Sequence, residues 1–416
     1  MIKRNPSGCL SVSSPSPIRL LLVIVWLLGF TQPHSSYAGN LDVLHNLIGS
    51  TDAVLVSDSH GRTLFSKNAD HRLVPASTLK ILTALAALHY LGPDHRFITE
   101  FYMDHNHNLL VKGYGDPLLI SEVIADITAK LAARLDTRHQ TINDLVLDEA
   151  YFADPIVIPG VTSSYEPYDA PNGALCVNFN TVNFKRNNNG TYVSAESQTP
   201  LLPLVIPRIH ASRLNQGRII LSRRDNESTL YAGQLLLYFM KQQGFHCGGK
   251  IRIGRVQKKF DKLILRYVSE FSMAQVISKL LEHSNNFMAN QLLIAAGAKA
   301  YGPPGTLSKG VRSVSVFAHD VLKLQNIHIV EGSGISRENR ISAQDLLTVL
   351  EAFGPYYRLM PREGKAFYKS GTLSGISTRV GYIENEAGET YRFVVLINTP
   401  GKSADRIMDR ILQCLD

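Results

Sequence analysis

Beyond its first forty residues, the chain lacks any apolar run long enough to cross a membrane. The one marked run covers positions 20–30, follows Lys3, Arg4 and Arg19, and precedes small residues at 36–38. This order of charge, short apolar core and small residues is typical of a secretory signal peptide. We therefore expect residues 1–38 to be a signal peptide cut after Ala38, with no stable membrane insertion afterwards; an uncleaved anchor is the alternative.

Cysteine is scarce, with four residues in a chain of 416. Cys9 would leave with the signal peptide, so Cys176, Cys247 and Cys414 would remain in an oxidising compartment. An odd number leaves one thiol unpaired. Cys176 and Cys247 could form a disulfide, whereas three buried thiols fit the sequence equally well.

Metal-ligand and nucleic-acid motifs are also missing. The 14 histidines are not spaced as metal ligands, and His105 and His107 lie in a polar loop that indicates a turn. We expect no metal, no cofactor and no nucleic-acid partner.

Loss of residues 1–38 would remove three positive and no negative charges, taking the formal net charge from +8 to +5. Mild positive charge suits a protein that works beside an anionic polymer.

Ser77 and Lys80 stand at the start of an apolar run that ends at Leu91, before Gly92 and Pro93. The run predicts a buried helix, ended by glycine and proline. Residues three apart share a helix face, so the two side chains can meet. Because burial lowers the pKa of a lysine, Lys80 could accept the proton of the Ser77 hydroxyl. On its own, however, Ser-x-x-Lys is also an ordinary helix start.

The remaining chain divides into a middle block and a helix-rich second half that ends in a strand pair and an amphipathic helix. This pattern predicts an α+β fold, an antiparallel sheet covered by helices. We expect strands at 54–56, 63–65, 145–148, 218–221, 251–253, 378–384 and 391–399, and helices at 79–91, 121–135, 228–243, 273–283, 287–300, 345–353 and 407–415.

Three motifs follow one another along the chain: Ser77-x-x-Lys80, Ser284-Asn285-Asn286 and Lys369-Ser370-Gly371. Their order matches the S-x-x-K, S-D-N and K-T-G motifs of penicillin-binding proteins and β-lactamases. Acyl transfer needs a nucleophile, a base, an acid for the leaving amine and donors for the oxyanion, and the three motifs can supply all four. The last motif lies on a predicted strand, and we expect Lys369 at its exposed end.

The sequence resembles the D-alanyl-D-alanine carboxypeptidase/endopeptidase family of the penicillin-binding protein 4 type, the low-molecular-mass class C penicillin-binding proteins. The resemblance rests on 75–80, 284–286, Gly-Ser-Gly-Ile-Ser-Arg at 332–337 and Tyr-x-Ala-Pro at 168–171. Two positions depart from the family pattern, since Ser370 replaces a threonine and Glu331 an aspartate. The resemblance implies a β-lactamase/transpeptidase-like catalytic domain in two parts, 39–96 and 264–416, separated by an inserted domain at 97–263.

The resemblance also implies roles for the site residues. Ser77 would be the acylated nucleophile, Lys80 its base and Ser284 a proton relay to the leaving group. Asn286 would hold Lys80 and the substrate amide. Lys369, Ser370 and Thr372 would bind the substrate's terminal carboxylate, and the N–H groups of Ser77 and Thr372 would form the oxyanion hole. We expect Gly371 to let the strand approach the substrate, and Asn285 to be a turn or packing residue.

The function implied is that of a periplasmic serine DD-carboxypeptidase, with a second activity as an endopeptidase, that acts on peptidoglycan stem peptides and is inhibited covalently by β-lactams. Two alternatives remain open. A β-lactamase shares the motifs, although no convincing Glu-x-x-x-Asn element precedes Lys369. A non-catalytic peptidoglycan-binding or β-lactam-sensing protein would form no acyl-enzyme. The sequence leaves the oligomeric state open.

Overall fold

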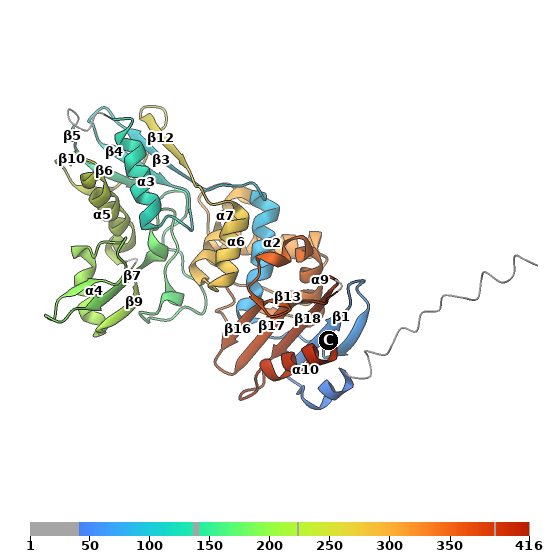
Figure 1. The fold of residues 1–416 in the computed structure, drawn as a ribbon. Coiled ribbons are helices and arrows are strands. Elements are labelled where there is room, and N and C mark those ends of the chain that lie inside the picture. Colours follow the sequence, from blue (N-terminus) through green and yellow to red (C-terminus); the bar gives the residue numbers. More distant parts are fainter. Residues whose placement is uncertain (1–40, 136–140, 223, 387, 416) are drawn as a thin grey trace, which may run out of the picture.

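The computed structural model describes residues 41–135, 141–222, 224–386 and 388–415, which form two lobes (Figure 1). The expected signal peptide lies outside the described residues. One lobe contains the first and last described segments, and the other contains the middle of the chain. Within the described ranges, no helix is long and apolar enough to cross a membrane.

The first lobe is built on a six-stranded antiparallel sheet with the order β15-β16-β17-β18-β1-β2. The strands expected at 54–56 and 63–65 pair with each other as β1 and β2, and the expected C-terminal strand pair is confirmed as β17 and β18. β1 also pairs with β18, so segments distant in the sequence meet in one sheet. The strands are β1 (Asp52–Ser57), β2 (Thr63–Lys67), β15 (Arg362–Glu363), β16 (Ala366–Leu373), β17 (Ile376–Glu384) and β18 (Thr390–Ile397).

Helices cover both faces of this sheet, which confirms the expected α+β class. The amphipathic C-terminal helix α10 and the short helix η1 pack on one face, because Ile407 and Ile411 recur on a single side of α10. The other face is covered by α2, α9 and the helices behind them. The helices are η1 (Asp42–Asn46), η2 (Ala76–Leu79), α2 (Lys80–Leu91), α6 (Met273–Glu282), α7 (Asn286–Tyr301), α8 (Leu307–Val316), η7 (Phe317–Val321), α9 (Ala343–Phe353), η8 (Gly354–Leu359) and α10 (Asp405–Leu415).

The second lobe has a core of its own, between a five-stranded sheet of order β11-β6-β4-β3-β12 and two long helices, α3 and α5. This sheet is mixed, since β4, β6 and β11 run parallel whereas β3 pairs antiparallel with β4 and β12. A three-stranded sheet, β8-β7-β9, completes the lobe. The main elements are β3 (Ile98–Met103), β4 (Leu109–Gly113), α3 (Ser121–Ala132), β6 (Leu145–Asp148), β7 (Thr181–Arg186), β8 (Tyr192–Ser194), α4 (Ile206–Ser212), β9 (Gln216–Ile220), α5 (Glu227–Gln242), β11 (Ile251–Ile253) and β12 (Lys262–Val268).

Shorter elements connect these sheets and helices. They are the strands β5 (Thr141–Ile142), β10 (His246–Cys247), β13 (Ile327–His328) and β14 (Arg340–Ile341), and the 3₁₀ turns η3 (Pro167–Asp169), η4 (Asn178–Asn180), η5 (Pro203–Val205) and η6 (Arg224–Asn226). The three described cysteines, Cys176, Cys247 and Cys414, are not joined by disulfides, so the pairing of Cys176 with Cys247 is not found. Of the three, only Cys176 is buried.

The chain enters and leaves the second lobe at one place. Ile98 of β3 is the register partner of Val268 of β12, and Ser269 N donates to Phe97 O at 2.8 Å. We therefore propose that the inserted region runs from about 97 to 268, with β12 wholly inside it. The two lobes also share packing, since residues of the segment 152–176 belong to the core around α2 and α7.

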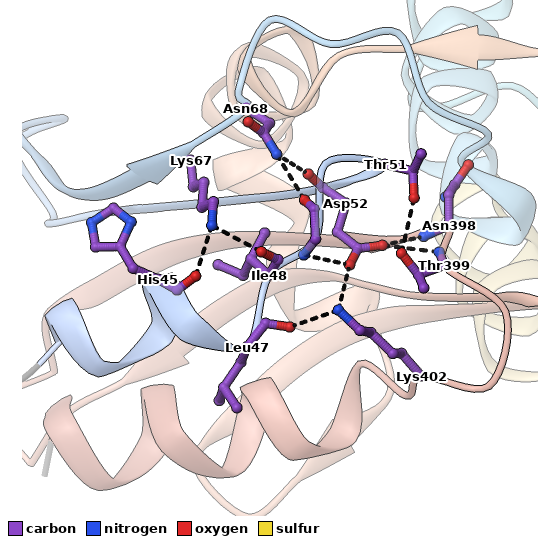
Figure 2. Close-up of polar contacts among 11 residues, drawn as sticks. His45, Leu47, Ile48, Thr51, Asp52, Lys67, Asn68, Asn398, Thr399 and Lys402 are labelled. Atoms are coloured by element: carbon purple, nitrogen blue, oxygen red, sulfur yellow. Dashed lines mark hydrogen bonds and ion pairs between the residues drawn. The ribbon is translucent and has the colours of Figure 1, made fainter.

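A buried carboxylate fastens the strands that lead to Ser77 (Figure 2). Asp52 Oδ1 accepts from the N–H groups of Asn398 and Thr399, and its Oδ2 accepts from Gly49 N at 2.8 Å. Burial raises the pKa of Asp52, but these hydrogen bonds outweigh it and hold the pKa below its usual value. The Asn398 side chain in turn accepts from Val74 N at 2.9 Å and donates to Val74 O at 3.2 Å, which fixes the chain just before Ser77.

Candidate active site

Ser77 lies in a 3₁₀ turn, η2, and not in the first turn of an α-helix as the sequence predicted. The α-helix α2 begins at Lys80 and ends before Gly92, whose φ of 97° confirms the predicted glycine stop. Ala76 has a φ of 50°, an uncommon backbone conformation for a residue with a side chain. Such strain is maintained only where the surrounding structure enforces it, as it often is at active sites. Ser77 itself is partly exposed, as a nucleophile must be.

Lys80 is fully buried and makes three hydrogen bonds. Its Nζ lies 2.8 Å from Ser77 Oγ, 2.8 Å from Asn286 Oδ1 and 2.7 Å from the carbonyl oxygen of Ser333. Burial and the positive charge of Lys369 lower the pKa of Lys80 well below its usual value, while the Glu331 carboxylate acts in the opposite direction. The predicted contact between the first and second motifs is therefore present.

The partners of Lys80 determine where its lone pair points when it is neutral. The Ser333 carbonyl can only accept a hydrogen bond, and so can the Asn286 amide oxygen. A neutral amine has two N–H donors, and these two acceptors use both. The lone pair then faces Ser77 Oγ, the one partner that can donate a proton. This geometry is the one that a base acting on the Ser77 hydroxyl would need.

The second motif sits where α6 gives way to α7. Asn285 caps α7, because its side chain accepts from Met288 N at 3.0 Å, which confirms the expected structural role. Asn286 is the first residue of α7; its Nδ2 donates to the carbonyl of Tyr168 at 3.2 Å. Ser284 precedes them with a φ of 50° and is partly exposed. In the described part of the chain, none of the hydrogen bonds of Lys80 goes to Ser284.

The third motif lies on β16, as the sequence predicted, but Lys369 is not exposed. Its side chain is 1% exposed, and its Nζ donates to the carbonyl of Ser370 at 2.8 Å. Burial, with the charge of Arg379, lowers the pKa of Lys369 to about 8. The prediction of an exposed Lys369 was wrong because successive residues of a strand face opposite sides. Lys369 and Gly371 face the helical core, whereas Ser370 and Thr372 are exposed on the other face. The two hydroxyls thus lie on the opposite face of β16 from the lysine.

Beyond Phe367, β16 pairs with β17 on one side and with no other named strand among the described residues. Glycine brings this free edge close to the nucleophile. A Cβ at Gly371 would lie 2.8 Å from Ser77 N, so no larger residue fits there without a shift. The absence of a side chain at Gly371 therefore leaves room for the 3₁₀ turn η2. From the sequence, this glycine was expected to leave room for the substrate.

The loop at 331–334 completes the site. In the sequence it was recognisable only through the family resemblance. Glu331 is fully buried; its Oε2 accepts from Ser333 N at 2.6 Å and its Oε1 from Gly334 N at 2.7 Å and Asn339 Nδ2 at 2.6 Å. These bonds hold the Ser333 carbonyl that Lys80 contacts. A Cβ at Gly334 would lie 1.9 Å from Ala76 O, so the loop also presses on the strained residue. In the sequence, only the Gly-Ser-Gly stretch at 332–334 indicated that this loop belongs to the site.

Comparison with known proteins gives a consistent result. A profile of the D-Ala-D-Ala carboxypeptidase 3 (S13) family matches residues 41–207 and 212–358. A D-alanyl-D-alanine carboxypeptidase from Actinomadura sp. (strain R39) is 24% identical over 445 residues, which cover 88% of this chain and 81% of that protein.

Solved structures share the fold. Penicillin binding protein 4 from Haemophilus influenzae matches with a TM-score of 0.71 at 20% identity, over 87% of this chain and 94% of that one. The same protein complexed with a β-lactam gives a TM-score of 0.66 at 20% identity, with the same coverage. A predatory peptidoglycan endopeptidase from Bdellovibrio bacteriovorus gives 0.51 at 15% identity, over 87% of this chain and 92% of that one. At these identities the likeness concerns the fold.

Proposed function

This chain belongs to the D-Ala-D-Ala carboxypeptidase 3 (S13) family and is a serine-type carboxypeptidase, and on that premise we propose that it cleaves the terminal D-Ala-D-Ala bond of peptidoglycan peptides through an acyl-enzyme on Ser77. The observation that carries this assignment is the 2.8 Å contact between Lys80 Nζ and Ser77 Oγ, with both other partners of Lys80 being acceptors.

In the acylation step, neutral Lys80 takes the proton of Ser77 Oγ as that oxygen attacks the carbonyl carbon of the penultimate D-alanine. The carbonyl oxygen becomes an oxyanion, which the backbone N–H groups of Ser77 and Thr372 stabilise. The C–N bond then breaks, and the leaving amine receives the proton from Lys80, relayed by Ser284. The products are free D-alanine and the peptide esterified to Ser77.

In the deacylation step, Lys80 takes a proton from a water molecule whose oxygen attacks the ester. The C–O bond to Ser77 breaks and Oγ recovers a proton from Lys80. The shortened peptide leaves with a new carboxylate, and the enzyme returns to its starting state.

The edge of β16 supports a binding mode for the substrate. A peptide added as an extra strand along that edge would form backbone hydrogen bonds with β16. Its terminal carboxylate would lie against Lys369, which carries most of its charge below its pKa of about 8. Ser370 and Thr372 would donate from the other face of the strand, and Asn286 would bind the substrate amide.

We further propose that the protein works in the periplasm and is acylated by β-lactams. The positively charged N-terminal sequence with its apolar run supports export. The β-lactam complex of the penicillin binding protein 4 from H. influenzae supports inhibition by the same class of compound. A second activity, cleavage of cross-linked peptides, is supported by the shared fold of the B. bacteriovorus endopeptidase.

One experiment tests the proposal. The chain lacking residues 1–38 is incubated with a muropeptide pentapeptide, a cross-linked dimer and a penicillin, and the products are identified by mass spectrometry. We expect loss of D-alanine from the pentapeptide and a stable penicillin adduct, both absent in Ser77→Ala. Rapid turnover of the penicillin would favour a β-lactamase, and absence of both reactions would favour a non-catalytic protein. An adduct on Ser77→Ala would refute the assigned nucleophile.

A further inference from the structure

The segment 250–266, which runs from the start of β11 to β12, is the most basic surface of the second lobe. It contains seven cations and one anion, Asp261; the cations are Lys250, Arg252, Arg255, Lys258, Lys259, Lys262 and Arg266. All seven are exposed. In Figure 1 the connection between β11 and β12 lies at the top of its lobe, away from α2, α6 and α7. No role in the proposed catalysis uses this surface.

Part of this charge holds the segment in place. Lys258 Nζ lies 3.2 Å from Glu100 and Arg266 Nε lies 3.6 Å from the same carboxylate, while Arg252 pairs with Asp144 at 2.7 Å. Asp148 also fixes the connection, since its Oδ2 accepts from Val256 N at 3.0 Å. The connection is therefore a formed structure rather than a loose loop.

Three of the remaining cations are exposed to solvent, and the nearest acidic residue in the sequence is Asp261, which directly precedes Lys262. Arg255, Lys259 and Lys262 form no ion pair within the described ranges. Between them stands Phe260, whose side chain is 74% exposed, with Lys259 Nζ 5.8 Å from the ring centre. A large exposed aromatic residue among unpaired cations is unusual for a surface that only meets water.

A groove runs beside these residues. It has a volume of about 510 Å³ and lies between the β11–β12 connection and the turn at Asp104 and His105. Its lining includes the buried apolar residues Leu110 and Val146, the exposed Phe260, the cations Arg252 and Arg255, and the two carboxylates of Asp104 and Asp261. Apolar side chains beside the two arginines suit a ligand that combines apolar groups with carboxylates, although Asp104 and Asp261 offset part of that positive charge.

We propose that this surface, Arg255, Lys259, Phe260 and Lys262 with the adjoining groove, binds the polymeric substrate at a distance from the nucleophile. The ligand is a glycan strand that carries peptides with free carboxylates. The carboxylates pair with the three cations, and Phe260 packs against a sugar ring. The inference rests on the proposed function, because that function makes a carboxylate-bearing polymer the substrate. The surface holds the enzyme on the polymer between cleavage events and leaves the chemistry at Ser77 unchanged.

The test compares insoluble and soluble substrates. The full chain without residues 1–38 is cosedimented with purified peptidoglycan sacculi, alongside the variant Arg255→Glu, Lys259→Glu, Lys262→Glu. A matched control reverses three exposed cations elsewhere, Lys185→Glu, Lys299→Glu, Arg406→Glu. We expect the first variant to bind sacculi about tenfold more weakly than the control, and the binding of the wild type to fall with added salt. D-alanine release should fall for sacculi and stay unchanged for a soluble pentapeptide.

Each outcome has a defined meaning. Equal sacculus binding by the two triple variants would overturn the proposal. Wild-type binding to vesicles containing phosphatidylglycerol, with no binding to sacculi, would overturn it in favour of a membrane surface. Failure of the wild type to process the soluble pentapeptide would instead count against the proposed function. Phe260→Ala, which changes no charge, should also weaken sacculus binding, and it provides a test should the triple variant fold poorly.

Discussion

At the scale of single residues, Lys80 gives the sharpest prediction. Lys80→Arg should be as inactive as Lys80→Ala, because a guanidinium stays protonated at any working pH and cannot accept the Ser77 proton. Lys80 is also fully buried, so the larger arginine side chain would not fit in its place without a shift of the surrounding residues. The measurement is the rate of penicillin acylation, followed by intact mass. Acylation of the arginine variant at more than a few per cent of the wild-type rate would mean that the base lies elsewhere.

If Lys369 binds the substrate carboxylate as proposed, substrate selection should depend on pH. Its pKa of about 8 means that the cation is present below pH 8 and is lost as the pH rises through that value. The preference for a peptide with a free C-terminal carboxylate over its C-terminal amide, taken as a ratio of kcat/KM, should therefore fall above pH 8. Because Lys80 acts on both substrates alike, the ratio isolates Lys369.

The matched variant for this prediction is Lys369→Met, which keeps most of the buried side chain. A charge-assisted hydrogen bond to a carboxylate contributes about 1.5–3 kcal/mol, so kcat/KM for the free acid should fall about tenfold to hundredfold. The ratio should then be low and independent of pH. A ratio that still changes around pH 8 in Lys369→Met would assign the titration to another group.

Asp116 affects stability rather than chemistry. Burial raises its pKa to about 6, against the lowering effect of the hydrogen bond from Leu118 N to Asp116 Oδ1. The folded protein therefore holds a proton that the unfolded chain releases near pH 4, and stability falls as the pH rises from about 4 to 6. Asp116→Asn removes this loss, so it should stabilise the protein by up to about 3 kcal/mol at neutral pH.

The measurement for Asp116→Asn is denaturant unfolding at several pH values. The gain over wild type should be near zero at pH 4, should grow until about pH 6 and should stay constant above it. A gain that is the same at every pH would reflect packing or hydrogen bonding and not the titration of this carboxyl.

At the scale of elements, the close approach of β16 to η2 predicts a sensitive glycine. In Gly371→Ala the added Cβ would lie 2.3 Å from Thr378 Oγ1 and 2.8 Å from Ser77 N, so β16 or η2 must shift. Misplacement of the Ser77 hydroxyl by about 1 Å should slow penicillin acylation about hundredfold. Gly354→Ala is the control, since nothing lies within 4 Å of its Cβ. Equal acylation rates in the two variants would show that the contact is not needed.

Most elements around the site could be predicted from the sequence, because local periodicity and end signals define them. The apolar run of α2 with Gly92 and the apolar stripe of α10 were each sufficient. The mixed sheet of the second lobe was not predicted in its topology, since strand pairing depends on contacts between distant segments. The 3₁₀ form of η2 also depends on such contacts, as β16 and the Gly334 loop surround it.

The site itself was predictable to the extent that side chains do the chemistry. The contact of Ser77 with Lys80 follows from their spacing, and that of Lys80 with Asn286 followed from the resemblance. The Ser333 carbonyl that completes the environment of Lys80 was missed, because a backbone group has no signature in the sequence. The burial of Lys369 was missed for a related reason: a strand residue is buried or exposed according to what packs on each face.

At the scale of the whole molecule, the shared packing of the lobes predicts what excision would do. The ends at Ile98 and Val268 are close enough for a short linker. However, Leu118, Phe152 and Ile156 from the excised region are buried in the core beside α7. Each contributes about 1.5–3 kcal/mol, which together approaches the total stability of a typical domain.

Replacement of residues 98–268 by a Gly/Ser linker should therefore yield a protein that unfolds at room temperature or aggregates. Thermal unfolding and penicillin adduct formation measure the result. A folded variant that forms the adduct at the wild-type rate would show that the catalytic lobe needs none of this packing.

The pairing of β1 with β18 joins Asp52 to Ile397 as register partners, and this pairing has a consequence for how the enzyme comes into being. A ribosome makes β1 long before β18, so β1, which lies between β18 and the edge strand β2, lacks one of its two neighbours until the chain has been made up to Ile397. Contacts so distant in sequence form slowly. Val74, three residues before Ser77, is held by Asn398, which directly follows β18, so the segment before Ser77 is fixed only after β18 has been made. We therefore expect a chain in which β18 has not yet paired with β1 to be inactive, so that the hydrolase cannot act before this sheet is assembled.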